Sequence, residues 1–132
     1  MSKSFKLDIV NPEKSFLSKE NAIEVVVPAF EGEMGILKDH ISIISFLKPG
    51  MIKIISSTSQ ESYYIEDGIV EFKDNNLSIL TSSIFSLSDM DRNKVEQILK
   101  EAENEKNNSE TDDQKRYLLN QKIDTLKSIS TN

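Results

Sequence analysis

Glu31 and Glu33 are the residues of this sequence whose type and spacing could do chemistry. Two carboxylates two positions apart point to one face of an extended segment, as a general acid/base pair or a metal site would need. His40 is the only histidine, cysteine is absent, and no nucleophile motif or phosphate-binding glycine loop occurs in the sequence. We therefore expect no catalytic residue, no metal site and no cofactor, and plain solvated strand charges remain the alternative role for the two glutamates.

The composition excludes several further classes of function. A formal net charge of −6 and a pI near 4.8 argue against nucleic-acid binding and against adhesion to anionic lipid, both of which need clustered Lys and Arg. The longest apolar stretch, residues 41–47, is far shorter than the roughly 20 residues that span a bilayer. We expect a soluble protein without a targeting segment, with enough apolar residues for one modest core.

Through about Leu87 the apolar residues recur with a period of two, as in Phe5–Ile9 and Ala22–Pro28. Short runs of this kind, separated by Pro, Gly, Asn and Asp, predict an antiparallel β-sandwich of about ten strands over residues 1–87. Asp74-Asn75-Asn76 is a good hairpin turn, because Asn and Asp tolerate positive φ. The serine-rich residues 56–59 lack a nucleophile motif and predict another hairpin loop.

After Leu87 the period changes to that of a helix. A cap pattern at Ser88–Asp91 precedes a first apolar stripe, and a second cap pattern beginning at Thr111 precedes another. The stripes consist of Val95, Ile98, Leu99 and Ala102, and of Leu118, Leu119, Ile123, Leu126 and Ile129. We expect residues 88–132 to form an antiparallel two-helix hairpin whose narrow stripes must lie on the sandwich or on a partner.

Three sequence motifs carry a resemblance to a known family. The first is Glu31-Gly32-Glu33-Met34-Gly35-Ile36-Leu37 closed by His40, the second begins Leu47-Lys48-Pro49-Gly50, and the third is Asp67-Gly68-Ile69-Val70-Glu71-Phe72. Together they resemble the epsilon subunit of the bacterial F-type ATP synthase over nearly the whole chain, with Asp67 in place of a family glycine. That family combines a β-sandwich with a helical hairpin, which agrees with the fold expected from the periodicities.

The resemblance implies a non-catalytic rotor subunit of the central stalk, which couples proton flow through the ring of c subunits to ATP synthesis elsewhere. Its implied partners are the gamma subunit and the c-ring, with transient contact to the alpha and beta subunits. Its implied location is the cytoplasmic face of the bacterial inner membrane, held there through the complex. The implied ring-facing interaction loop contains Glu31, Gly32, Glu33, Gly35 and His40.

The resemblance also bears on the helical hairpin. Family members that bind ATP begin the first helix with an Asp-x-x-Arg-Ala pattern, where this chain has Asp91, Lys94 and Val95. Lysine cannot supply arginine's planar fork of donors, so we expect a poor ATP sensor. The second helix carries cations that could contact the catalytic head and act as a weak brake on hydrolysis: Lys115, Arg116, Lys122 and Lys127.

Two other functions remain open at this point. A stand-alone nucleotide-sensing module that uses the helical hairpin is the main alternative, and ATP binding by the isolated chain would distinguish it. A small hydrolase is disfavoured because the motifs for it are absent. The coupling ion, proton or sodium, leaves no mark in this sequence.

Overall fold

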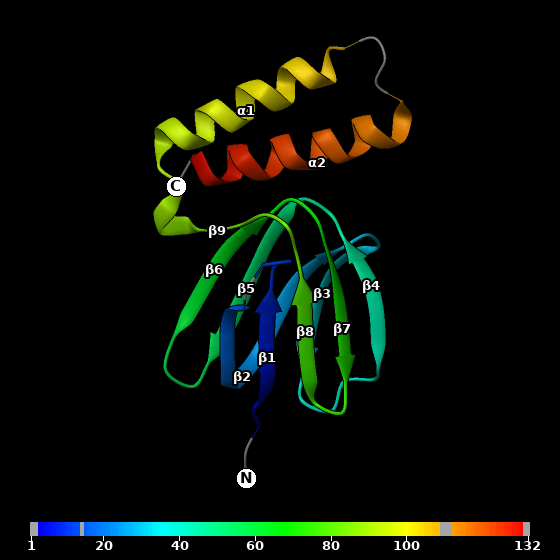
Figure 1. Ribbon diagram of the computed structural model, residues 1–132, viewed down its shortest axis with the longest axis vertical. Helices are drawn as coiled ribbons and strands as arrows, with labels where there is room; N and C mark the ends of the chain where they lie inside the picture. The colour runs from blue at the N-terminus through cyan, green and yellow to red at the C-terminus, as the bar shows by residue number, and fades with distance from the viewer. Residues whose placement is uncertain (1–2, 14, 109–111, 131–132) are drawn as a thin grey trace.

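The computed structural model describes residues 3–13, 15–108 and 112–130, and within them nine strands precede two helices (Figure 1). The first strands are β1 (Phe5–Val10), β2 (Ser15–Ala29), β3 (Gly32–Leu37), β4 (Ile43–Leu47) and β5 (Gly50–Ser56). They are followed by β6 (Gln60–Ile65), β7 (Gly68–Lys73), β8 (Asn76–Leu80) and β9 (Ile84–Ser86). The helices are α1 (Arg92–Lys106) and α2 (Asp113–Ser130), so the predicted β-sandwich followed by a helical hairpin is confirmed.

The strands form two layers that share the long strand β2. Its first half pairs with β1, which continues through β8 and β7 to β4. Its second half pairs with β3 on one side and with β5 on the other, and the layer continues from β5 through β6 to β9. The pairings are antiparallel except that β1 and β8 run parallel, a departure from the purely antiparallel sandwich that was expected.

The core lies between the two layers and is built by the alternation seen in the sequence. Phe5, Leu7 and Ile9 of β1 point inward, as do Ile52 and Ile54 of β5. The buried apolar residues of this cluster come from β1 to β8, and α1 and α2 contribute none of them among the described residues. The sandwich therefore has a core of its own.

The predicted turns lie where the sequence placed them. Asp74 and Asn75 connect β7 to β8 with φ of 53° and 60°, the two positive values that a type I′ hairpin requires. The residues between β5 and β6 form the serine-rich loop, in which the Ser56 hydroxyl and the Ser59 backbone N–H are hydrogen-bonded at 3.2 Å.

The predicted apolar stripes are buried or partly buried in the hairpin. The residues that cap the two helices, however, differ from those expected from the sequence. The Asp91 carboxylate, not Ser88, accepts the Lys94 N–H at 2.8 Å at the start of α1, because residues 87–89 form a short 3-10 turn instead. Thr111 lies outside the described residues, and the Asp112 carboxylate accepts the Lys115 N–H at 2.7 Å at the start of α2.

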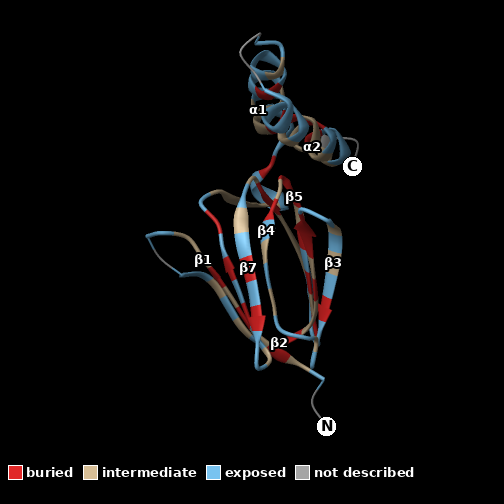
Figure 2. Cartoon of the chain, turned by 90° about the vertical axis from the view of Figure 1, so that its right-hand side faces the viewer, coloured by how far each residue is buried: buried red, intermediate tan, exposed pale blue. Residues whose placement is uncertain are grey.

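The hairpin lies across one end of the sandwich, opposite the end from which the N-terminus leaves (Figure 1). A second apolar cluster joins the two parts through the buried residues Tyr64, Met90, Val95 and Leu126. Figure 2 shows both helices mostly in the colour of exposed residues, and the buried residues of the hairpin belong to its contacts with the sandwich and to the contact between the two helices.

Candidate functional site

The two candidate carboxylates lie in the β2–β3 turn (Glu31) and at the start of β3 (Glu33), at the end of the sandwich that faces the helices. Phe30 and Glu31 form the turn, and Gly32 follows with a φ of 138°, a conformation that favours glycine. The Ser45 hydroxyl donates to the Glu31 carboxylate at 3.4 Å, and both glutamates are exposed. The turn therefore presents two solvated acceptors on a fixed backbone.

Gly35, which the resemblance placed in the ring-facing loop, lies within the regular strand β3. It lies in regular pairing opposite Val26 of β2, and its φ is not positive. A Cβ at this position would lie 3.2 Å from the Glu24 carboxylate, which is the end of a flexible side chain. Gly35 leaves room for Glu24 to cross the sheet surface, and the backbone does not require glycine there.

His40 lies at the opposite end of β3 from Glu31. Its neighbour Asp39 has a φ of 66° and accepts a hydrogen bond from the Asn75 side chain at 3.0 Å, which places this segment beside the β7–β8 turn. The His40 imidazole is hydrogen-bonded to the Ile41 carbonyl at 2.7 Å and packs edge-on against the Phe72 ring. Because the six residues of β3 span about 20 Å, His40 cannot share one contact loop with Glu31 and Glu33.

An exposed apolar surface on the β4–β7–β8 layer was missed by the reasoning from sequence. Phe46, Ile69 and Leu80 are partners in register across the three strands, and their side chains face solvent. Phe46 is 65% exposed and Ile44 on the same strand is 72% exposed. Phe30 packs edge-on against Phe46 at 6.5 Å between ring centroids. We call these five residues the apolar face: Phe30, Ile44, Phe46, Ile69 and Leu80.

The apolar face left a signal in the sequence. The run Ile41–Leu47 carries large apolar residues at successive positions as well as alternate ones, so both faces of the strand are apolar. One face fills the core through Leu47, whereas the other faces solvent. Soluble monomers rarely expose contiguous apolar patches of this kind, so the apolar face is a candidate partner-binding surface.

The positions of the degenerate ATP motif have structural roles in the hairpin. The Asp91 carboxylate caps α1, and the Lys94 ammonium lies 4.7 Å from the centroid of the Phe85 ring. A bound nucleotide would therefore compete with the helix cap for the Asp91 carboxylate and with the cation–π contact for the Lys94 ammonium.

The cations of the second helix have different environments. Lys122 lies 2.7 Å from Glu66 of the sandwich, and Lys115 lies 3.2 Å from Glu105 of α1. The side chains of Arg116 and Lys127 are exposed. The structure thus spreads the four cations over separate sites in the folded hairpin.

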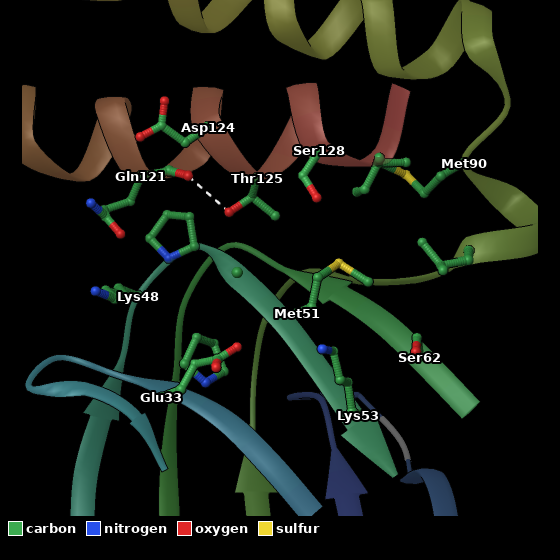
Figure 3. A pocket seen from close by; sticks show the side chains of 15 residues that line it. Glu33, Lys48, Met51, Lys53, Ser62, Met90, Gln121, Asp124, Thr125 and Ser128 are labelled. Atoms are coloured by element: carbon green, nitrogen blue, oxygen red, sulfur yellow. Dashed lines mark hydrogen bonds between the residues drawn. The ribbon is translucent and has the colours of Figure 1, made fainter. Parts of the chain in front are cut away.

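A cleft of about 700 Å³ separates part of α2 from the sandwich (Figure 3). Asp124, Thr125 and Ser128 of α2 line one wall, while Lys48 and Lys53 belong to the other (Figure 3). Glu33 lies at its edge, so one of the two candidate carboxylates faces this cleft and the hairpin.

Two neighbouring tyrosines have perturbed acid–base properties. Burial raises the pKa of Tyr64 far above its ordinary value, and the nearby Glu66 carboxylate raises it further. Burial, together with Glu61, raises the pKa of Tyr63 to about 12. Both phenols are therefore held neutral as hydrogen-bond donors to carboxylates.

Neither a metal-binding cluster nor a membrane-spanning helix occurs in the part of the chain that the structure describes. No group of three or more His, Asp or Glu side chains lies close enough in 3–13, 15–108 and 112–130 to hold a metal ion. Within the same ranges, neither helix is long and apolar enough to cross a membrane.

Comparisons with known proteins agree with one another. The family described as the beta-sandwich domain of the ATP synthase delta/epsilon chain matches residues 4–86. A Pelagibacter ubique (strain HTCC1062) protein named ATP synthase epsilon chain is 65% identical over 130 residues, covering 98% of this chain and 100% of that protein. The mitochondrial ATP synthase subunit delta of Schizosaccharomyces pombe is 36% identical over 106 residues, covering 79% of this chain and 64% of that protein.

A solved structure adds a likeness of fold. One chain of the Euglena gracilis mitochondrial ATP synthase, from a cryo-EM structure of its OSCP/F1/c-ring part, has a TM-score of 0.78 and 21% identity. The superposition covers 97% of this chain and 81% of that chain, so it includes both the sandwich and the hairpin.

Proposed function

The chain belongs to the delta/epsilon chain family of ATP synthase, and we propose that it is a non-catalytic rotor subunit of the central stalk. In this role it binds the gamma subunit and the c-ring and couples ion flow through the ring to ATP synthesis in the catalytic head. It is held at the cytoplasmic face of the bacterial inner membrane as a peripheral part of the complex. Its contacts with the alpha and beta subunits are transient.

The apolar face is the observation that supports binding to gamma most strongly. Its residues come from β4, β7, β8 and the β2–β3 turn, so they form one continuous surface on a rigid layer. Large apolar side chains at the centre of a surface are typical of stable interfaces within a complex. A rigid sheet with such a surface suits a stalk subunit, because the contact with gamma has to transmit torque and a flexible segment would deform under it.

The contact with the c-ring is assigned to Glu31 and Glu33 alone. Both carboxylates are exposed at one turn, where they can accept hydrogen bonds from Arg, Asn or Gln side chains of the ring. His40 is left out of this contact, because it lies at the other end of β3 beside the β7–β8 turn. Gly32 fixes the turn, whereas Gly35 serves the packing of Glu24.

Regulation of hydrolysis by the hairpin is weak in this proposal. Lys122 and Lys115 are engaged in ion pairs within the folded chain, so they are not available to the catalytic head unless those pairs break. Exposed ion pairs that replaced them would each contribute only about 0–1 kcal/mol.

Substitution within the apolar face tests the proposal. Phe46→Glu places a charge in the proposed interface, and Leu37→Glu is a matched control, because Leu37 is 53% exposed on the other layer. We expect Phe46→Glu to weaken binding to gamma at least about 30-fold, as loss of an interface hot spot does, while Leu37→Glu binds like the wild type. Both variants should keep the circular dichroism of the wild type. Equal binding by the wild type and both variants would contradict the assigned surface.

A further inference from the structure

The contact between the hairpin and the sandwich combines a buried apolar cluster with a cleft. Tyr64 and Leu126 are fully buried where they meet, together with Met90 and Val95. Beside this cluster, the cleft of about 700 Å³ lies between α2 and strands β2, β3 and β5, and Met90 of the cluster also lines it (Figure 3). Polar contacts between α2 and the sandwich add to the apolar cluster.

One carboxylate joins the two parts at the edge of the apolar cluster. The Tyr64 hydroxyl donates to Glu66 Oε2 at 3.2 Å, and the Lys122 ammonium of α2 lies 2.7 Å from the same oxygen. The side chains of Lys122 and Glu66 are 21% and 26% exposed, so the ion pair is largely shielded from water and salt. Charge-assisted hydrogen bonds this short are about twice as strong as neutral ones.

A second polar contact between α2 and the sandwich is weaker. The Lys48 ammonium reaches the Tyr117 hydroxyl at 3.3 Å and lies 5.7 Å from the centroid of its ring. Both groups are near the surface at the start of α2, and neither contact joins opposite charges. The ion pair between Glu66 and Lys122 is therefore stronger than this contact.

We propose that Glu66 is a positioning residue that latches α2, and with it the whole hairpin, onto the sandwich. Glu66 is suited to this role because it directly follows β6, whose last residues Tyr64 and Ile65 are buried in the two apolar clusters. The Tyr64 hydroxyl then orients the carboxylate toward α2. Lys122 precedes Ile123 and lies one turn before Leu126, so the latch acts on the part of α2 that is already packed.

When the ion pair is lost, the hairpin should leave the sandwich more often, but its two helices should stay packed on each other. The two helices have a separate apolar cluster of Ala102, Leu119 and Ile123, with Leu99 packed against it. An ion pair of 3.2 Å between Lys115 and Glu105 also joins α1 to α2 without involving the sandwich. Loss of Glu66 therefore changes how the hairpin is placed and leaves its internal structure in place. The proposed role of Glu66 concerns the isolated chain. Experiments could therefore contradict it without contradicting the proposed function in the ATP synthase complex.

Hydrogen exchange on the full chain tests the latch with a matched control. Glu66→Gln keeps an acceptor for Tyr64 and removes the charge that holds Lys122. Glu105→Gln removes the charge of an ion pair inside the hairpin. We expect Glu66→Gln to speed exchange of the protected amides of residues 84–91 about tenfold, while the mutual protection of α1 and α2 changes little. Glu105→Gln should leave residues 84–91 like the wild type.

A double-mutant cycle with Lys122→Met completes the test. If the two side chains act through each other, Lys122→Met should by itself speed exchange in the same segment, and adding it to Glu66→Gln should add little. Additive effects would overturn the latch, as would equal exchange of residues 84–91 in Glu66→Gln and Glu105→Gln. A uniform loss of protection across the sandwich and both helices would also overturn it, because Glu66 would then be a general stability residue.

Discussion

Removal of the helical hairpin should leave a folded but less stable sandwich. A chain of residues 1–87 keeps the whole inner cluster between the layers, to which α1 and α2 contribute nothing among the described residues. The truncated chain loses apolar contacts only in the second apolar cluster, which joins the sandwich to the hairpin. There Tyr64 changes from fully buried to exposed, and Met51 and Phe85 become more exposed. Exposure of Tyr64 costs about 1.5–3 kcal/mol, and the two partly buried side chains add about 1–2 kcal/mol.

The summed loss of about 3–5 kcal/mol is an upper estimate, because the unfolded chain already buries some of this surface. Domains of this size have free energies of unfolding of about 5–15 kcal/mol, so the truncated chain should fold. Urea unfolding of the full and truncated chains measures the difference, and binding to gamma checks that the apolar face is intact. Tyr64→Thr in the truncated chain controls for self-association through the newly exposed phenol. A truncated chain that is unfolded in both versions would refute the separate core and the boundary at residue 87.

Three further outcomes are expected. Burial and Glu66 raise the pKa of Tyr64 above the unfolded value of 10.0. The contribution of Tyr64 to the free energy of unfolding should therefore be fully present below pH 10 and should fall as the pH rises above it. Tyr64→Phe should flatten that fall by up to about 1.4 kcal/mol per pH unit in urea unfolding, and an unchanged slope would contradict the assignment. Gly68→Ala should lower the free energy of unfolding by about 1–3 kcal/mol, because φ is 156° and a Cβ would lie 2.8 Å from the Leu80 carbonyl oxygen. Gly35→Ala should lower the free energy of unfolding by less than about 1 kcal/mol. Equal decreases for Gly35→Ala and Gly68→Ala would refute the different roles of the two glycines. The pure chain should neither hydrolyse ATP nor bind it with micromolar affinity in calorimetry, because Asp91 and Lys94 are engaged in the hairpin.

Local chemistry made much of the fold predictable. The Asp74–Asn75 turn follows from the tolerance of both residues for positive φ, and the helical stripes follow from a period of 3.6. The alternation of β1 and β5 likewise predicted which side chains fill the core. These features depend on residues that are close together in the chain. They can therefore be predicted from the sequence without knowing the tertiary contacts.

Features that depend on pairing across the fold were not predictable in the same way. A register shift between Ala22 and Glu24 changes the alternation of β2, so Ala22 and Val25 are buried while Ile23 is not fully buried. The first half of β2 is too polar to be recognised as a strand, and its pairing with β1 is what establishes it.

The candidate site was harder to predict than the fold for a physical reason. Glu31 and His40 are close in sequence, but a regular strand between them carries the chain from one end of the sandwich to the other. The apolar face arises because Phe46, Ile69 and Leu80 lie in register on three strands that are far apart in the chain. The caps of the two helices differed because several acidic and hydroxyl residues compete at each helix start, and the geometry selects one.

Binding of the purified chain to an assembled head containing alpha, beta and gamma subunits tests the central claim most directly. We predict saturable binding of one chain per gamma subunit, which Phe46→Glu abolishes and Leu37→Glu preserves. The same chain should not bind a head that lacks gamma. Absence of binding to the complete head, or equal binding with and without gamma, would contradict a rotor subunit held to the stalk by its apolar face.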